Sequence, residues 1–164
     1  MTILSDTDLS NIFLDKLGYQ LDTCGIKIHP DKNYFKVKNG KYIPKSAKDN
    51  EIKLKKGVFY LLTTKEDIYV TEDQCAFVHG RSTLGRHGIF IHFTAGLIDP
   101  GFRGKITLEV LSYDHDYILD LNEQIGVIVF HKLETMCTKP YQFGQHHYMY
   151  QKDVTLPYDI SKKQ

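Results

Sequence analysis

The sequence lacks several features that would restrict its fold or its location. Its 164 residues include only three cysteines, Cys24, Cys75 and Cys137, which lie far apart and form no CxxC pair. We therefore expect reduced, buried or half-buried thiols and no disulfide framework. No apolar run approaches the ~20 residues that a membrane-spanning helix needs. The N-terminus has no basic region followed by an apolar run, so no signal peptide is predicted. A soluble, cytoplasmic protein without a membrane partner is expected.

A strong net charge is also missing. The chain has 21 Lys and Arg against 20 Asp and Glu, a formal net charge of +1. This balance gives no general electrostatic reason to expect nucleic-acid binding, so any site for a polyanion must be local. No repeat, low-complexity tract or long linker divides the chain. Since a domain of about 150 residues buries roughly 68–70% of its unfolded surface, residues 1–164 are predicted to form one domain.

One short helix is predicted near the N-terminus. Ser5 and the acidic residues after it can cap a helix, and Leu9, Ile12, Phe13 and Leu17 recur at helical spacing. Gly18 ends this pattern. We expect the helix to serve in packing.

The rest of the chain predicts an all-β fold. Asn39-Gly40 between two alternating segments indicates a type I′ hairpin. Many short strands with closely spaced turns are typical of a sandwich or closed barrel. The strands are expected at residues 26–29, 34–37, 42–43, 52–54, 58–63, 68–70, 76–79, 88–94, 105–112, 118–121 and 126–133.

The stretch from Gly80 to Glu109 is the most informative part of the sequence. Its Asp-Pro-Gly at residues 99–101 predicts a turn, because proline presets one backbone angle and glycine permits another. In the strand that follows, Thr107 and Glu109 alternate with apolar residues and therefore point to the same face. A strand is rigid enough to aim a carboxylate.

Four blocks of this stretch resemble the dCTP deaminases of the trimeric dUTPase superfamily. They are residues 81–86 (RSTLGR), 92–95 (HFTA), 98–102 (IDPGF) and 107–109 (TLE), in the order and spacing of that family. The resemblance implies a distorted jelly-roll, dUTPase-like β-barrel with a short N-terminal helix and a C-terminal lid segment. It also implies a homotrimer with active sites at the subunit interfaces.

Glu109 is the candidate catalytic acid and base, although a lone glutamate on a half-buried sheet is ordinarily an exposed residue without a special role. Deaminating cytosine means adding water at C4, protonating the ring and expelling ammonia, so one group must accept a proton and return it. Zinc-dependent deaminases carry an H-x-E…P-C-x-x-C signature, which this sequence does not contain. No zinc is therefore expected, and the resemblance implies that Glu109 is the only proton carrier.

The resemblance also implies roles for other residues of the stretch. Ser82 and Arg86 would help to hold the water and the developing negative charge. Ala95 would contact the base through its backbone, and Asp99 would contact the deoxyribose. Phe102 lies where the superfamily often places an aromatic residue against the sugar, but a core position fits it nearly as well.

Residues 81–86 are the candidate phosphate site. If Ser82 caps this turn, free N–H groups can bind phosphate oxygens, and arginine adds bidentate contacts. The alternative is a connecting turn with surface arginines. We expect Mg²⁺ to be bound through the triphosphate, with no ligand from the protein. The expected nucleotide-binding residues are Arg81, Ser82, Thr83, Leu84, Gly85, Arg86, Ala95, Asp99, Phe102, Thr107, Leu108, Glu109, Tyr141, His147 and Gln151.

The segment from residue 140 to residue 151 resembles the C-terminal lid of the family. Tyr141 matches a Pro-Tyr pair, and Gln151 matches a tail glutamine. The lysine that the family places before a tyrosine is His147 here, which binds phosphate as a cation only when protonated.

These features favour a dCTP deaminase that converts dCTP and water to dUTP and ammonia, with dTTP as a candidate inhibitor. The first alternative is a bifunctional enzyme that goes on to dUMP and pyrophosphate. A pure dUTPase is disfavoured, because such enzymes lack the glutamate and end in a Gly-rich motif. A non-catalytic nucleotide-sensing module is the third alternative.

Overall fold

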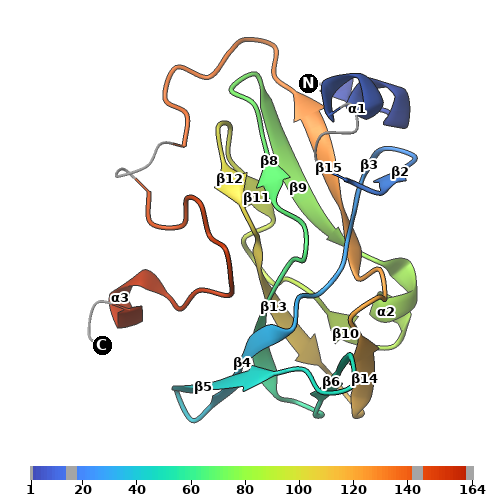
Figure 1. Ribbon diagram of the computed structural model, residues 1–164, viewed down its shortest axis with the longest axis vertical. Coiled ribbons are helices and arrows are strands. Elements are labelled where there is room, and N and C mark those ends of the chain that lie inside the picture. The colour runs from blue at the N-terminus through green and yellow to red at the C-terminus, as the bar shows by residue number, and fades with distance from the viewer. Residues whose placement is uncertain (1, 14–17, 142–145, 162–164) are drawn as a thin grey trace.

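The computed structural model describes residues 2–13, 18–141 and 146–161. Antiparallel strands dominate it, and the helices are short (Figure 1). In chain order the elements are β1 Thr2–Ile3, α1 Asp6–Phe13, β2 Leu21–Asp22, β3 Gly25–Ile28, β4 Asn33–Lys38, β5 Lys41–Ser46, β6 Glu51–Leu54, β7 Phe59–Thr63, β8 Ile68–Tyr69, β9 Gln74–Gly80, α2 Ser82–Arg86, β10 Ile89–Phe90, β11 Leu97–Ile98, β12 Arg103–Gly104, β13 Thr107–Ser112, β14 Tyr117–Asp120, β15 Gly126–Lys132 and α3 Tyr158–Ser161.

Two sheets hold most of the strands. One has the order β11-β9-β15-β3-β2, with β1 also paired to β15, and the other has the order β10-β13-β7-β4-β5. Two further pairs, β12 with β8 and β14 with β6, form separate two-stranded sheets. The buried cluster takes Ile28, Val78 and Ile128 from the first sheet and Leu62 and Val110 from the second. The core therefore lies between two antiparallel sheets, and the expected all-β fold is confirmed.

The described part of the N-terminal helix, α1, agrees with the predicted start. The Ser5 hydroxyl accepts a hydrogen bond from the Asp8 amide at 3.2 Å, and the Asp8 carboxylate accepts one from the Ser5 amide at 2.9 Å. This reciprocal pair starts α1. Leu9 and Phe13 are buried, but Ile12 is 41% exposed, so its expected place in the packed face is wrong. Leu17 lies outside the described residues.

The predicted hairpin at Asn39-Gly40 is confirmed. Both residues have positive φ, 51° and 71°, as a type I′ turn requires. The turn joins β4 to β5, which pair from Lys38↔Lys41 outward. The hairpin therefore has the register that the two-residue loop predicted.

The cysteines are all free, as expected. Cys75 is buried and Cys137 half-buried, whereas Cys24 is exposed, contrary to the prediction. Burial, together with the charge of Asp99, raises the pKa of the Cys75 thiol. Among residues 2–13, 18–141 and 146–161, no helix is long and apolar enough to cross a membrane.

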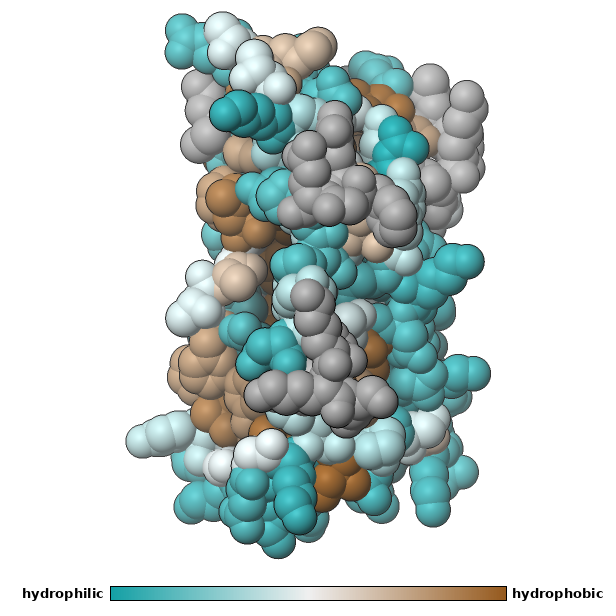
Figure 2. Space-filling model, turned by 90° about the vertical axis from the view of Figure 1, so that its left-hand side faces the viewer, coloured by the Kyte–Doolittle hydropathy of each residue, from teal (hydrophilic) through white to brown (hydrophobic). Residues whose placement is uncertain are grey.

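The C-terminal segment, residues 146–161, lies along one side of the molecule, coloured red in Figure 1. Figure 2 views the molecule from that side and shows apolar residues gathered mainly along one edge, while the opposite edge is largely hydrophilic. Large apolar side chains on the surface include Phe90, Phe93 and Leu97, which are 46%, 47% and 52% exposed. These three residues come from the stretch that carries the candidate site.

Candidate functional site

A cleft of about 480 Å³ lies between one face of β13 and the C-terminal segment. It brings together seven of the predicted site residues, which are up to 56 positions apart in the sequence, from Ala95 to Gln151. These seven are Ala95, Asp99, Phe102, Thr107, Glu109, Tyr141 and Gln151.

Glu109 is held at the wall of this cleft by β13. Leu108 and Val110 on either side of it are each 1% exposed and point into the core, so the half-buried Glu109 points to the opposite face, as predicted. Its Oε2 accepts a hydrogen bond from the Phe93 amide at 3.0 Å. The carboxylate is thus fixed both by its strand and by the neighbouring loop.

That loop was wrongly predicted to be a strand. The sequence alternation extends over residues 88–94, but pairing with β13 stops after Phe90. Beyond it, the Phe93 amide bonds the Glu109 carboxylate and no longer follows a strand ladder. Phe93 packs against Phe59 and Phe90 at the surface, with ring centroids 6.0 and 5.7 Å apart. Breaking the ladder is what brings a backbone donor to Glu109.

The predicted Asp-Pro-Gly turn forms one end of the cleft. The Phe102 amide donates to the Asp99 carbonyl at 3.2 Å, and Gly101 has φ +84°. A side chain at Gly101 would come within 2.9 Å of Pro140 Cβ. The turn therefore requires glycine both for its backbone angle and for the close approach of Pro140 and Tyr141.

Phe102 and Tyr141 form an aromatic wall. Phe102 is 6% exposed and meets Tyr141 edge-on, with ring centroids 5.5 Å apart. Burial raises the pKa of the Tyr141 hydroxyl, and the nearby Asp99 carboxylate adds to this effect. The hydroxyl accepts a hydrogen bond from the Tyr148 amide at 3.2 Å. Phe102 is thus both a core residue and part of the cleft, so the two sequence interpretations of it are compatible.

The C-terminal segment closes the other side of the cleft. The Lys105 amide donates to the Gln151 carbonyl at 2.9 Å, and the Tyr150 amide donates to the Arg103 carbonyl at 2.7 Å. Gly104, at φ +129°, lies so close that a Cβ there would be 2.7 Å from the Gln151 nitrogen. These backbone contacts attach the segment to β12 without a regular strand.

A side-chain contact adds to this attachment beside Glu109. The Thr107 hydroxyl donates to Gln151 Oε1 at 3.1 Å, and the Thr155 amide donates to the same hydroxyl at 3.4 Å. Thr107, predicted to share a face with Glu109, therefore joins β13 to the C-terminal segment.

Residues 81–86 do not line this cleft within one chain. In Figure 1, α2 and the C-terminal segment lie on opposite sides of the molecule. The predicted cap is wrong: Arg81 is the N-cap residue, and among the described residues no side chain caps the helix. Leu84 is fully buried in the core, whereas Arg81, Ser82, Thr83, Gly85 and Arg86 are exposed.

Two other predicted site residues also lie away from the cleft. The Leu108 side chain is part of the core, so only its backbone is available to a ligand. His147 is exposed and stacks on Tyr158. In this arrangement its ring faces the end of the C-terminal segment.

Several residues of the cleft were not predicted. Ile106 carried a visible signal, since it precedes the Thr-Leu-Glu block, and Tyr148 follows His147 in the lid resemblance. Ile98 belongs to the IDPGF block, and Leu97 directly precedes it. Nothing in the sequence pattern marked Leu61 and residues 155–157, because folding brings these distant segments to the cleft. The unpredicted residues are Leu61, Leu97, Ile98, Ile106, Tyr148, Thr155, Leu156 and Pro157.

A family model and relatives of known description point to the same family. A family model described as dCTP deaminase-like matches residues 17–133, which include α2 and Glu109 but end before Tyr141. The "dCTP deaminase, dUMP-forming" of Methanocaldococcus jannaschii is 39% identical over 145 residues, covering 84% of this chain and 70% of the relative. Its namesake from Methanococcus aeolicus is 39% identical over 126 residues, covering 77% of this chain and 54% of the relative.

A third relative matches a shorter stretch of the chain at higher sequence identity. The protein of the same description from Methanococcus maripaludis strain C7 is 49% identical over 70 residues, which cover 43% of this chain and 34% of that protein. The chain thus spans only about a third to a half of the length of the Methanococcus relatives. The crystal structure of 2'-deoxycytidine 5'-triphosphate deaminase from Agrobacterium tumefaciens matches with a TM-score of 0.72 at 18% identity, covering 82% of this chain and 50% of that one. This likeness supports the same fold.

Proposed function

Because the chain belongs to the dCTP deaminase-like family, we propose that it catalyses the hydrolytic deamination of dCTP, with Glu109 as the acid and base. The observation that carries the proposal is the position of this carboxylate. It is half-buried in a cleft and fixed by the Phe93 amide at 3.0 Å. A group that shuttles protons needs such a defined position relative to the base.

In the proposed reaction, Glu109 takes a proton from a water molecule as its oxygen bonds to C4 of cytosine. It passes this proton to the ring nitrogen, takes the second proton from the new C4 hydroxyl and passes that one to the amino group. The C4–N bond then breaks, which releases ammonia and leaves the C4 carbonyl of uracil. The Phe93 amide engages Oε2, and among the described residues no donor is bonded to Oε1. Oε1 is therefore the oxygen that faces the water. This route requires no zinc.

The cleft offers suitable partners for the rest of the nucleoside. Asp99 is placed to accept a hydrogen bond from a sugar hydroxyl, and the Phe102–Tyr141 wall suits the apolar side of a deoxyribose. The Thr107–Gln151 contact would hold the C-terminal segment closed over a bound nucleotide. These residues would orient the base above Glu109.

The phosphate-binding residues would come from a second copy of the chain. Arg81, Ser82 and Arg86 are exposed on α2, away from the cleft of their own chain. The exposed Phe90, Phe93 and Leu97 lie on the same stretch and suit an interface between copies. We therefore propose a homotrimer with shared active sites, in which α2 of one subunit completes the cleft of its neighbour.

Magnesium would enter with the triphosphate. Two carboxylates line the cleft, Asp99 and Glu109, and no group of three His, Cys, Asp or Glu that could hold a metal occurs in the described part of the chain. These residues fit a cation held mainly by phosphate oxygens and water. The ion would neutralise charge on the phosphates.

A second candidate function follows from the names of the relatives. All three that are compared above are described as dUMP-forming. In that case the same cleft would also cleave dUTP to dUMP and pyrophosphate, with Asp99 as the residue best placed to orient the attacking water. This bifunctional reaction includes the deamination as its first part.

The test is to incubate the protein with dCTP and Mg²⁺ and to resolve dCTP, dUTP, dUMP and ammonia by chromatography and an ammonia assay. Wild type should release ammonia, and Glu109→Gln should release none above background. Glu134→Gln, on the exposed surface, is the matched control and should behave as wild type. Appearance of dUMP would favour the second candidate. Binding of dCTP without turnover would favour a sensing module and contradict both enzymatic functions.

A further inference from the structure

The helix that carries the proposed phosphate site, α2, has little of its own to fix its orientation. It contains five residues, of which only Leu84 is buried, and within the described part of the chain no side chain caps its start. Its N-cap residue, Arg81, donates its backbone amide to the Ile125 carbonyl at 3.1 Å. The Arg81 side chain is exposed, so its direction can be set only by neighbouring elements.

Tyr117 of β14 lies beside both ends of α2, on the same side of the molecule (Figure 1). Its ring packs against the ring of His87, the C-cap residue of α2, with centroids 6.0 Å apart. Burial and the Glu123 carboxylate raise the pKa of the Tyr117 hydroxyl, and the Arg81 guanidinium lowers it. The hydroxyl therefore lies within the electric field of the arginine at the start of α2.

The Tyr117 hydroxyl is itself fixed by a carboxylate. It donates to both oxygens of Glu123, Oε1 at 3.2 Å and Oε2 at 3.3 Å, and both side chains are half-buried. Glu123 lies two residues before Ile125, whose carbonyl accepts the Arg81 amide. A fixed negative charge thus belongs to the same turn that holds the backbone of Arg81.

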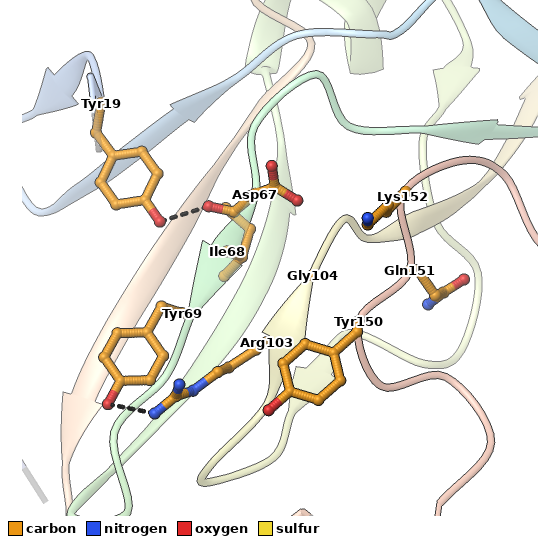
Figure 3. A pocket seen from close by; sticks show the side chains of 9 residues that line it. All are labelled: Tyr19, Asp67, Ile68, Tyr69, Arg103, Gly104, Tyr150, Gln151 and Lys152. Atoms are coloured by element: carbon orange, nitrogen blue, oxygen red, sulfur yellow. Dashed lines mark hydrogen bonds between the residues drawn. The ribbon is translucent and has the colours of Figure 1, made fainter. Parts of the chain in front are cut away.

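A second tyrosine of the protein contacts an arginine directly. In Figure 3, the Tyr69 hydroxyl accepts a hydrogen bond from Arg103 at 3.2 Å, and the guanidinium lies 4.4 Å from the centroid of the Tyr69 ring. Arg81, in contrast, forms no ion pair with any carboxylate of residues 2–13, 18–141 and 146–161. Its donors therefore remain available for phosphate oxygens while a fixed anion acts on it from nearby.

We propose that Tyr117 and Glu123 are positioning residues for phosphate binding, which together hold α2 and direct the Arg81 guanidinium toward the triphosphate. Tyr117 supports the C-terminal end of the helix through His87, and Glu123 supplies a fixed negative charge near its N-terminal end. The inference rests on the proposed function, because it takes α2 as the phosphate site. It predicts an effect on the affinity for polyphosphate and none on proton transfer at Glu109.

The test uses a probe that consists of phosphate alone. Binding of magnesium tripolyphosphate is measured by calorimetry, beside KM and kcat for dCTP and the affinity for deoxycytidine, which has no phosphate. Tyr117→Phe keeps the ring and removes the hydroxyl. Tripolyphosphate should bind about three- to tenfold more weakly, and KM should rise by a similar factor, because a hydrogen bond to a charged group is lost.

The same variant distinguishes positioning from a general loss of structure. In Tyr117→Phe, kcat and the affinity for deoxycytidine should stay as in wild type. Equal weakening of deoxycytidine, or a fall in kcat with unchanged KM, would overturn the proposal. Tyr113→Phe, at a tyrosine that is 67% exposed, is the matched control and should bind tripolyphosphate as wild type.

Double variants test the route of the effect. Glu123→Ala should weaken tripolyphosphate as much as Tyr117→Phe does, and the two together should cost no more than either alone, because both break one contact. In an Arg81→Ala background, Tyr117→Phe should cause little further loss. Full additivity with Arg81→Ala would contradict an action through this arginine.

The outcomes also separate this inference from the proposed function. If Arg81→Ala leaves tripolyphosphate binding unchanged, α2 is not the phosphate site, and the positioning role fails with it. If Arg81→Ala weakens binding but Tyr117→Phe does not, only the positioning role fails. If the binding results are as expected but wild type releases no ammonia from dCTP, the deamination alone is contradicted.

Discussion

The two parts of the motif stretch, α2 and β13, hold their functional side chains in opposite ways. Glu109 on β13 is half-buried and hydrogen-bonded to the Phe93 amide. Ser82 and Arg86 on α2 are exposed, and only Leu84 anchors the helix in the core. A proton carrier needs a fixed position, whereas a cation for a mobile phosphate can become ordered on binding. The comparison shows that the cleft around Glu109 is formed within one chain, whereas α2 is exposed away from it.

The largest effect is expected when Glu109 and Arg86 are replaced in separate variants and subunits of the two variants are then mixed. Glu109→Gln should lower the deamination rate by about 10²–10⁴-fold, and Arg86→Ala by about 10²-fold or more. If the two residues of one site come from different subunits, trimers that combine both variants should regain about a quarter of the sites by random assortment. Ammonia release by the co-expressed, purified mixture measures this. Mixed trimers without activity would show that the two residues do not meet between chains.

The next effect concerns the backbone donor that fixes Glu109. Phe93→Pro removes the amide that bonds Oε2, and the rate should fall by about tenfold or more, since a charge-assisted hydrogen bond is lost. Phe93→Leu keeps the amide and alters only the surface aromatic contacts. A kcat of Phe93→Leu as low as that of Phe93→Pro would assign the effect to the ring instead.

A smaller effect is expected where the C-terminal segment meets β12. Gly104→Ala places a Cβ 2.7 Å from the Gln151 nitrogen at φ +129°, which should destabilise docking of the segment by about 1–3 kcal/mol. The exchange of the Tyr150 amide should become faster and KM should rise. Gly57→Ala, at φ +65° but with nothing within 4 Å of the added Cβ, is the matched control. Equal exchange in the two variants would contradict the close contact.

The smallest effect is expected at Thr107. Thr107→Val removes the hydrogen bond to Gln151 Oε1, a loss of about 0.5–1.5 kcal/mol. KM for dCTP should therefore rise a few-fold with little change in kcat. Thr107→Ser keeps the hydroxyl and should restore the wild-type KM. A fall in kcat alone would instead place Thr107 in the chemistry.

The sequence was a good guide wherever a local pattern determines the structure. Alternation over β13 correctly assigned Leu108 and Val110 to the core and Glu109 to the opposite face, because the side-chain period of a strand is two. The turns at Asn39-Gly40 and at residues 99–101 were predicted from residues that tolerate positive φ.

The sequence was a poor guide where contacts between distant segments determine the structure. Residues 88–94 alternate like a strand, yet the Phe93 amide finds a carboxylate instead of a strand partner. Ser82 has the right chemistry for a cap, but it is already the first residue of α2, and the N-cap position falls on Arg81. The joining of Thr107 to Gln151, 44 positions away, has no local signal.

The contact between Gly104 and the Gln151 backbone has a consequence for traffic into and out of the cleft. Direct hydrogen bonds run along this contact, from the Tyr150 amide to the Arg103 carbonyl and from the Lys105 amide to the Gln151 carbonyl. We therefore expect a path between the cleft and bulk solvent beside the exposed Ala95 and Leu97, which also line the cleft. Nucleotide entry and ammonia release would then use the same path, and a group that covers this path would control the rates of both.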